Sequence, residues 1–137
     1  MPNFPIHAQD YIPQRPPIVM IDNILKSEDD VFVTDLLIRP DNIFVENGRL
    51  RETGLMENIA QTSAARVGFC AGGVNVPIGV IGGINQFQLH FLPKVGQTLV
   101  TTIHVVAGVG SALVVDATVT CEEQLVATCS MKVFITQ

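Results

Sequence analysis

The sequence is poor in charge, and most of its charge is negative. Charged residues make up 15% of the 137 residues, and 8 lysines and arginines against 13 aspartates and glutamates give a formal net charge of −5. Nucleic acid binding needs clustered cations that neutralise phosphates, so this balance argues against such a partner. Any basic patch that docks an acidic carrier protein must therefore be local. The candidate residues for it are Arg15, Arg39, Arg49, Arg51, Arg66 and Lys94.

Targeting and anchoring segments are also lacking. Hydrophobic residues reach 47%, but no apolar run approaches the roughly 20 residues of a membrane-spanning helix, so we expect no membrane span. Residues 1–5 have neither the basic nor the apolar region of a signal peptide. The 3 cysteines, an odd number without metal-ligand spacing, indicate free buried thiols in a reducing compartment. We expect a cytoplasmic protein that buries further apolar surface in an oligomer.

Several catalytic motifs are missing. The chain has no G-x-S-x-G elbow, no phosphate-binding loop ending in Gly-Lys-Ser/Thr, no G-x-G-x-x-G after a strand, and no His/Cys pair at ligand spacing. His90 and His104 lie among apolar residues of predicted strands, and we interpret both as structural. We therefore expect neither a metal nor another cofactor.

One stretch of the sequence, residues 53–71, has the pattern of a long helix. Thr53 is the expected N-cap, and the pair Gly72-Gly73 is expected to end the helix. Alanines supply helix propensity and small volume, so the helix can lie close to a sheet. The residues that recur near helical spacing are Leu55, Ile59, Ser63, Val67 and Cys70.

Most of the remaining sequence is rich in Val, Ile and Thr, which is typical of strands. Residues 18–21 are expected to be a short strand or a buried extended segment, and at most one helical turn fits around residues 8–11. The predicted strands span residues 31–38, 79–91, 97–107, 111–121 and 125–136, with turns at 108–110 and 122–124. One helix against a four-stranded antiparallel meander predicts a single α+β domain over residues 1–137.

Glu57 is the residue most open to a chemical role. It lies in the segment L-M-E-N-I-A-Q, at an otherwise apolar helix start. A buried carboxylate without partners costs free energy. Glu57 is therefore either a solvated residue of the first turn, stabilised by the helix dipole, or a general acid or base in a site. The residues alone leave both interpretations open.

Three segments of the chain follow a known pattern. Residues 12–22 read I-P-Q-R-P-P-I-V-M-I-D, residues 55–61 read L-M-E-N-I-A-Q, and residues 82–97 begin G-G-I and end F-L-P-K-V-G-Q. In this order they resemble the L-P-H-R-x-P-F-L-L-V-D, L-x-E-A-x-A-Q and G-I-D-x-x-R-F-R-x-P-V-x-P-G-D-Q motifs of FabZ-type 3-hydroxyacyl-acyl carrier protein dehydratases. The resemblance covers nearly the whole chain. It implies the hotdog fold, in which a curled antiparallel sheet wraps a long central helix and a second subunit completes a dimer.

The departures from that family concern its histidines. The family's catalytic histidine lies in a G-H-F-P-G loop before the helix, whereas residues 42–54 of this chain contain no histidine. Gln14 replaces the histidine of the opening motif, while Glu57 and Gln61 carry over. The loop looks more like that of the ApeP-type dehydratase-like proteins of aryl polyene pigment clusters.

The resemblance implies a division of chemical roles. Dehydration of a 3-hydroxyacyl thioester needs a base at C2, an acid at the C3 hydroxyl and donors for the thioester oxygen. We expect Glu57 to be the acid, Gln61 to orient the substrate, and the backbone N–H groups of Gly54, Leu55 and Met56 to be the donors. The base, a histidine in the family, is missing from this chain.

A second subunit would supply that base. In FabZ-type enzymes each site takes its histidine from one subunit and its glutamate from the other. We therefore expect this chain to be the Glu-donating subunit of a heteromeric dehydratase in fatty acid or polyene-type lipid synthesis. Its substrate would be an acyl thioester on acyl carrier protein or CoA, and its partner a hotdog subunit that carries the histidine. A homodimer is the other possible assembly, and alone it should be inactive.

Two other functions stay open. Hotdog thioesterases need no histidine, and Glu57 could activate water or attack the thioester. Alternatively, the chain is a non-catalytic scaffold or acyl-binding subunit. In each case we expect a narrow apolar tunnel between helix and sheet. Its candidate lining residues are Phe44, Phe69, Phe87 and Phe91.

Overall fold

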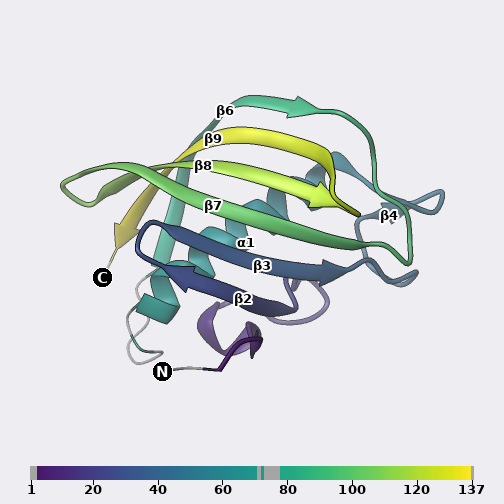
Figure 1. Cartoon of the computed structure of the whole chain (residues 1–137), viewed down its shortest axis with the longest axis horizontal. Helices are drawn as coiled ribbons and strands as arrows, with labels where there is room; N and C mark the ends of the chain where they lie inside the picture. The colour runs from purple at the N-terminus through teal and green to yellow at the C-terminus, as the bar shows by residue number, and fades with distance from the viewer. Residues whose placement is uncertain (1–2, 71, 73–77, 137) are drawn as a thin grey trace.

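A computed structural model, which describes residues 3–70, 72 and 78–136, places one long helix against one face of a seven-stranded antiparallel sheet (Figure 1). The helix is α1 (Glu52–Cys70), and a short 3-10 helix, η1 (Gln9–Tyr11), comes before it. The strands of the sheet are β1 (Ile6–His7), β2 (Asn23–Glu28), β3 (Val31–Leu37), β6 (Ile78–Leu89), β7 (Thr98–Val109), β8 (Ala112–Cys121) and β9 (Gln124–Thr136). A separate small hairpin before α1 consists of β4 (Val45–Glu46) and β5 (Arg49–Leu50). The predicted α+β class is confirmed.

The order of strands in the sheet differs from the predicted meander at one position. The order is β1-β2-β3-β7-β8-β9-β6, so the meander holds for β7, β8 and β9 only. β6 pairs with β9 instead, with Ile84 opposite Met131. The connection from β6 to β7, residues 90–97, is longer than a hairpin loop of about two to five residues, and it carries the chain from the edge of the sheet past β9 and β8 to the middle strand β7. β6 is therefore an edge strand.

The segment before β3 was the least predictable part of the sheet. Of residues 18–21, which were expected to be a strand or a buried extended segment, only Met20 and Ile21 are buried, Ile18 is exposed, and no strand forms there. The strand β2 begins only at Asn23, and the sequence pattern did not reveal it. A bulge between Ile24 and Lys26 interrupts the alternation of buried and exposed residues by which a strand is recognised.

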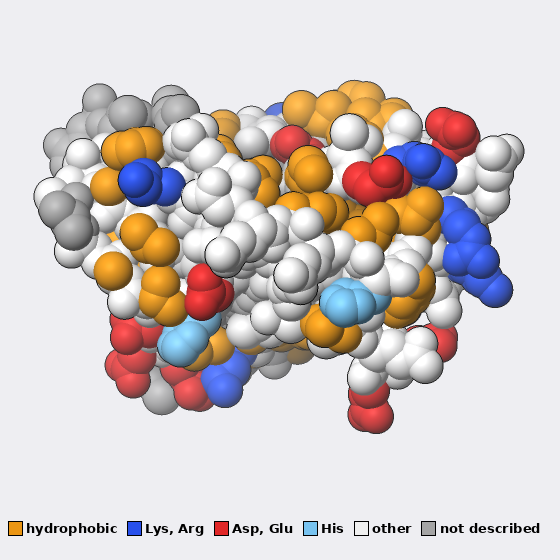
Figure 2. Space-filling view, turned by 90° about the horizontal axis from the view of Figure 1, so that it is seen from above, with side chains coloured by type: hydrophobic (Ala, Val, Ile, Leu, Met, Phe, Trp, Pro, Cys, Tyr) orange, Lys and Arg blue, Asp and Glu red, His pale blue; other side chains and the backbone are white. Residues whose placement is uncertain are grey.

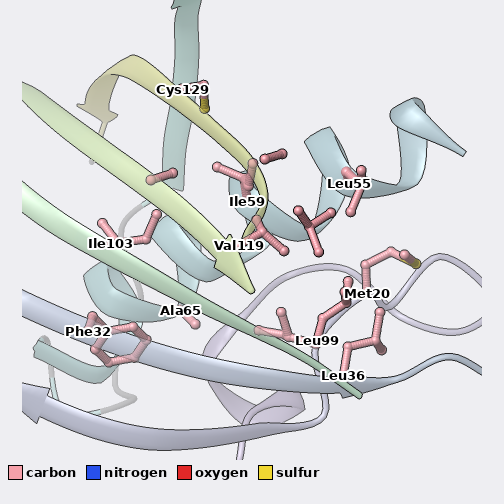
Figure 3. Packing of buried hydrophobic residues seen from close by; sticks show 14 of the residues in the cluster. Met20, Phe32, Leu36, Leu55, Ile59, Ala65, Leu99, Ile103, Val119 and Cys129 are labelled. Atoms are coloured by element: carbon pink, nitrogen blue, oxygen red, sulfur yellow. The ribbon is translucent and has the colours of Figure 1, made fainter. Parts of the chain in front are cut away.

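The hydrophobic core lies between α1 and the sheet (Figure 3). Leu55 and Ile59 of α1 are fully buried and join one cluster with Phe32 of β3 and with Leu99 and Ile103 of β7. Burying each such side chain contributes about 1.5–3 kcal/mol relative to leaving it in water. This packing holds the helix against the middle strands of the sheet.

Polar groups on the buried side of α1 add hydrogen bonds to this packing. The hydroxyl of Thr62 lies 2.8 Å from that of Thr34 on β3. The hydroxyl of Thr101 on β7 donates to Asn58 Oδ1 at 2.5 Å. Buried polar groups lose their hydrogen bonds if the helix shifts, so these bonds set the position of the helix along β3 and β7.

The ends of α1 differ slightly from the expected ones. The helix begins at Glu52, and the N–H groups of Gly54 and Leu55 donate to the carbonyl oxygen of Arg51. Thr53 is therefore an exposed residue of the first turn, and its prediction as N-cap was wrong. Gly72, with φ +76°, follows the helix, as a C-terminal glycine should. The predicted last helical residue, Ala71, and Gly73 lie outside the described residues. The described part of the chain contains no helix with the length and apolar character that crossing a membrane requires.

Asp35 on β3 generates a prediction about stability and pH. Burial raises the pKa of its carboxyl above the ordinary value of 3.8, although hydrogen bonds from Asn23 oppose the rise, and the Asp22 carboxylate adds to it. A raised pKa means that ionisation of Asp35 disfavours the folded state. The stability that the protonated carboxyl contributes is lost as the pH rises through its pKa in the folded protein.

We expect Asp35→Asn to raise the unfolding midpoint at pH 7, because the amide oxygen can still accept the bonds from Asn23 without a desolvated charge. The gain should disappear towards pH 3.8, where the wild-type carboxyl is itself protonated. Thermal unfolding at both pH values measures this. Equal gains at the two pH values would contradict the explanation by charge.

Candidate active site

Glu57 lies on the face of α1 that the sheet does not cover. Met56, Glu57, Ala60 and Ala64 are all partly exposed, and their spacing places them on one side of the helix. Leu55 and its neighbours on the core side are fully buried. The carboxylate is therefore accessible on a surface of otherwise small and apolar side chains.

Gln61, one turn after Glu57, holds this carboxylate in place. The Gln61 side chain is fully buried, and its Oε1 accepts the backbone N–H of Met20 at 2.6 Å. Its Nε2 donates to the carbonyl oxygen of Ile18 at 2.7 Å and to Glu57 Oε1 at 2.9 Å. The backbone N–H of Met20 is a donor, so the atom that faces it must be the amide oxygen Oε1. The amide nitrogen Nε2 must then face Glu57.

These bonds change the role expected of Gln61. Both N–H groups of its amide have protein acceptors, so Gln61 orients Glu57 and the N-terminal segment. That Gln61 orients substrate stays a prediction. Glu57 Oε1 accepts the hydrogen bond from Gln61, and Oε2 has no hydrogen bond among the described residues.

Asn58 is a polar residue of the site that the motif comparison did not single out. Its side chain is fully buried between the N-terminal segment and the sheet. Nδ2 donates to the carbonyl oxygen of Met20 at 2.8 Å, and Oδ1 accepts from Thr101. The available signal was an asparagine where the resembled helix motif has alanine, within an apolar run. Asn58, directly after Glu57, therefore ties the helix to the N-terminal segment and to β7.

Two of the three N–H groups expected as oxyanion donors, those of Gly54 and Leu55, form hydrogen bonds within the start of α1. The N–H groups of Gly54 and Leu55 donate to Arg51 O at 2.9 and 3.2 Å. Gly54 is buried, and a Cβ at this position would lie 2.7 Å from Phe44 Cβ and 2.9 Å from Leu50 Cδ1. The glycine is thus explained by the close approach of the β4–β5 segment to the helix, and an oxyanion role for residues 54–56 remains a prediction.

The apolar tunnel stays a prediction, and the cavities of the described residues show where its candidate lining residues lie. The cavity between α1 and the sheet beside Ser63 and Val67 has a volume of only about 10 Å³, too small for an acyl chain. Phe44 packs near Gly54, whereas Phe87 lines an open groove of about 570 Å³ with polar residues of β8 and β9. Phe91 packs against the core. The three phenylalanines do not meet in one pocket, because the core side chains fill the space between helix and sheet.

The strand β6 forms one edge of the sheet. β6 spans Ile78–Leu89 and contains no charged residue. It pairs with β9 on one side, and no strand among the described residues pairs with its other side. Figure 2, seen from above, looks onto this side of the molecule, where patches of hydrophobic side chains alternate with uncharged polar side chains and backbone. Edge strands normally carry charges or prolines that prevent further pairing, so this edge is suited to a partner.

The candidate cations do not combine into a strongly basic surface. Arg39 pairs with Asp22 at 3.3 Å, and Arg51 pairs with Glu52 at 3.4 Å. Arg49 directs its guanidinium to the carbonyl oxygen of Leu92 at 2.6 Å. The carboxylate partners of the first two cancel much of their field, so electrostatic attraction of an acidic carrier by this group is weak.

The cysteines are free, but only two of the three are buried. Cys121 and Cys129 lie in the core, whereas Cys70 at the end of α1 is exposed, contrary to the prediction that all three are buried. Burial raises the pKa of the Cys129 thiol to about 11, with a smaller effect of the Asp116 carboxylate. Cys129 is therefore protonated near neutral pH and is no nucleophile there. No group of three His, Cys, Asp or Glu side chains in the described ranges is arranged to hold a metal ion.

Comparison with known proteins identifies relatives in family and in fold. A family model described as ApeP-like, ApeP dehydratase, matches residues 6–137. No curated protein sequence matches the chain. The dehydratase heterocomplex ApeI:P from Xenorhabdus doucetiae is similar in structure, with a TM-score of 0.87 and 14% identity over 99% of this chain and 93% of that chain.

Other similar structures have other functions. The PaaI protein of the E. coli phenylacetic acid degradation operon has a TM-score of 0.67 at 14% identity, covering 81% of this chain and 80% of its own. A hypothetical thioesterase from Streptococcus pneumoniae, solved with coenzyme A, has a TM-score of 0.68 at 19% identity, covering 82% and 84%. At such identities these likenesses establish the fold alone, and they confirm the predicted hotdog arrangement.

The close packing at Gly54 generates a test of the helix start. We expect Gly54→Ala to destabilise the chain by about 1–3 kcal/mol, because the added methyl group overpacks against Phe44 and Leu50 despite the better helix propensity of alanine. Chemical denaturation measures the difference. Gly83→Ala is the matched control, since a Cβ there meets nothing within 4 Å, and it should stay within about 0.5 kcal/mol of wild type. Equal stability of the two variants would show that the segment before α1 yields without cost.

Proposed function

The chain belongs to the ApeP-like family of dehydratases, and from that premise we propose that it is one subunit of a heteromeric 3-hydroxyacyl thioester dehydratase. In this proposal it donates Glu57, and a second hotdog subunit donates the histidine. The observation that carries the proposal is the ordered Glu57–Gln61 pair on an uncovered helix face, in a chain without the family's histidine loop.

The histidines of this chain are poorly placed to replace the missing base. His7 lies on β1, His90 directly follows β6, and His104 lies on β7. None belongs to α1 or to the loop that leads into it. A site built around Glu57 therefore draws its base from outside these two elements, and a partner subunit is the simplest source.

The reaction needs one group on each side of the substrate. The partner's histidine takes the proton from C2, and electrons from that C–H bond form the C2–C3 double bond. The C3–O bond breaks, and the hydroxyl leaves as water after it takes a proton from Glu57 Oε2. Gln61 keeps Oε1 engaged throughout, so the proton-bearing oxygen of Glu57 faces the substrate.

The surface around Glu57 supports a partner at this place. The uncharged edge of β6 and the exposed side chains of Met56, Ala60 and Ala64 offer backbone hydrogen bonding and apolar contact. A subunit that covers them would enclose Glu57 and complete the predicted acyl channel. The similar heterocomplex from Xenorhabdus doucetiae is a dehydratase with two different components, as this arrangement requires.

The substrate in this proposal is an acyl thioester on acyl carrier protein or CoA, in cytoplasmic fatty acid or polyene-type lipid synthesis. The paired state of Arg39 and Arg51 means that this subunit contributes little to carrier docking. The exposed Lys94, which lies opposite Arg49 in a β-bridge, is its most available cation. Most of the contacts with the carrier then come from the partner subunit.

A thioesterase function is supported less well. Thioesterases occur among the similar structures, but at 19% identity they share the fold only, whereas the family match is to dehydratases. A scaffold role would leave the ordered bond between Gln61 and Glu57 without a purpose. Both alternatives are separated from the proposal by the activity of Glu57 variants.

We expect Glu57→Gln to lower the kcat of the assembled dehydratase by about 100- to 10,000-fold, because the amide cannot supply the proton to the leaving hydroxyl. The variant glutamine keeps an oxygen that can accept from Gln61, so folding and assembly should be preserved. The rise in absorbance as the conjugated enoyl thioester forms from a 3-hydroxyacyl thioester reports the rate. The chain without its partner should show no turnover.

Glu52→Gln, in the first turn of the same helix, is the matched control and should retain activity in the complex. Full activity of the Glu57→Gln complex would favour the scaffold role. Robust turnover by the single chain would overturn the heteromeric site. Release of free thiol without enoyl product, abolished in Glu57→Gln, would favour the thioesterase.

A further inference from the structure

Residues 3–22, here called the N-terminal strap, run alongside α1 before the chain enters β2 (Figure 1). One anchor of the strap is aromatic: the rings of Phe4 and Tyr11 pack against Phe69 near the end of α1, at centroid distances of 6.1 and 5.2 Å. The N–H of Ala8 donates to Asp22 O at 3.0 Å and closes the strap on itself. The strap is thus a folded element with its own contacts to the helix.

The second anchor of the strap is the Glu57 site itself. Met20 N and O bond to the side chains of Gln61 and Asn58, and Ile18 O accepts from Gln61 Nε2. Two backbone atoms of the strap, Met20 N and Ile18 O, therefore determine where the Gln61 amide lies, and Met20 O is held by Asn58. Since the same Nε2 also holds Glu57, a shift of residues 18–20 would be transmitted to the carboxylate.

Arg15 holds the turn that leads into this anchor. Its Nη1 lies 2.7 Å from the carbonyl oxygens of both Ile12 and Gln14, and 3.2 Å from that of Gln9. Its own carbonyl oxygen accepts the N–H of Ile18 at 3.2 Å. The guanidinium thus gathers carbonyl groups at the end of η1, and the backbone of the same residue fixes the start of the 18–20 segment.

Arg15 is exposed and forms none of the ion pairs found among the described residues. An exposed arginine that binds only nearby carbonyl groups contributes modestly to global stability. Its effect is local, on the shape of residues 12–18. This makes Arg15 a residue whose replacement should alter the site without unfolding the chain.

We propose that Arg15 is a positioning residue for Glu57, acting through the turn at residues 15–18, the backbone of Ile18 and Met20, and the amide of Gln61. The proposal rests on the proposed function, because it assigns Arg15 a part in the work of the same carboxylate. It also states something separate about the chain alone: the side-chain amide of Gln61 should respond to residue 15.

The first experiment uses the chain without its partner. The two N–H signals of the Gln61 side-chain amide, followed by NMR, should be shifted and should exchange with water at least several-fold faster in Arg15→Ala, because the Ile18 acceptor is no longer held. Arg15→Lys should give an intermediate result, since an ammonium group donates to carbonyls but lacks the planar fork. Lys132→Ala, which replaces an exposed cation on β9, is the control and should leave these signals unchanged. Unchanged Gln61 signals in Arg15→Ala would overturn the proposal.

The second experiment uses the assembled dehydratase. Arg15→Ala should lower kcat about tenfold with little change in KM, because a displaced acid affects the reacting geometry more than substrate binding. Arg15→Lys should recover part of the loss. Shifted Gln61 signals with unchanged kcat would contradict the positioning role. If Glu57→Gln is also fully active, the fault lies with the proposed function. If Glu57→Gln is inactive, the fault lies with the link from the strap to Glu57.

Discussion

The buried amide of Gln61 is the interaction on which the arrangement of the site depends. A carboxamide enclosed in a protein needs partners for its oxygen and for both N–H groups, since an unsatisfied buried group costs about 1–3 kcal/mol. Here Met20, Ile18 and Glu57 are those partners. The need to satisfy one side chain therefore joins the N-terminal strap, the helix and the carboxylate into one unit. Asn58 reinforces it, because the same Met20 residue is bound from a second position on the helix.

Much of the fold could be predicted because its signals are local. The helix over residues 52–70 follows from alanine content and apolar spacing, and the strands β7 to β9 follow from runs of β-branched residues with polar turns. The position of β6 beside β9 depends on pairing between distant residues, which a local pattern does not encode. β2 was missed because its bulge interrupts the alternation. Thr53 was misassigned because Arg51 O accepts the first helical bonds, two residues earlier than expected.

The candidate site shows the same division. Glu57 and Gln61 were recognisable from residue type and spacing. The partner of Gln61 on the strap, Met20, lies 41 residues earlier in the sequence, so only the fold shows the contact. Gly54 was assigned to anion binding, whereas the structure explains it by the approach of Phe44 and Leu50. The acyl tunnel was expected inside one chain. The cavity between α1 and the sheet beside Ser63 and Val67 is only about 10 Å³, so the tunnel stays a prediction for the proposed assembly.

The uncharged edge of β6 also has a consequence for how the chain must be produced. A strand with free backbone groups and no charged side chain is a template for any other strand, including the same edge of another copy. In the proposed heteromeric assembly, copies made in excess of the partner would leave this edge open to self-association. The supply of the partner would then limit the amount of usable protein.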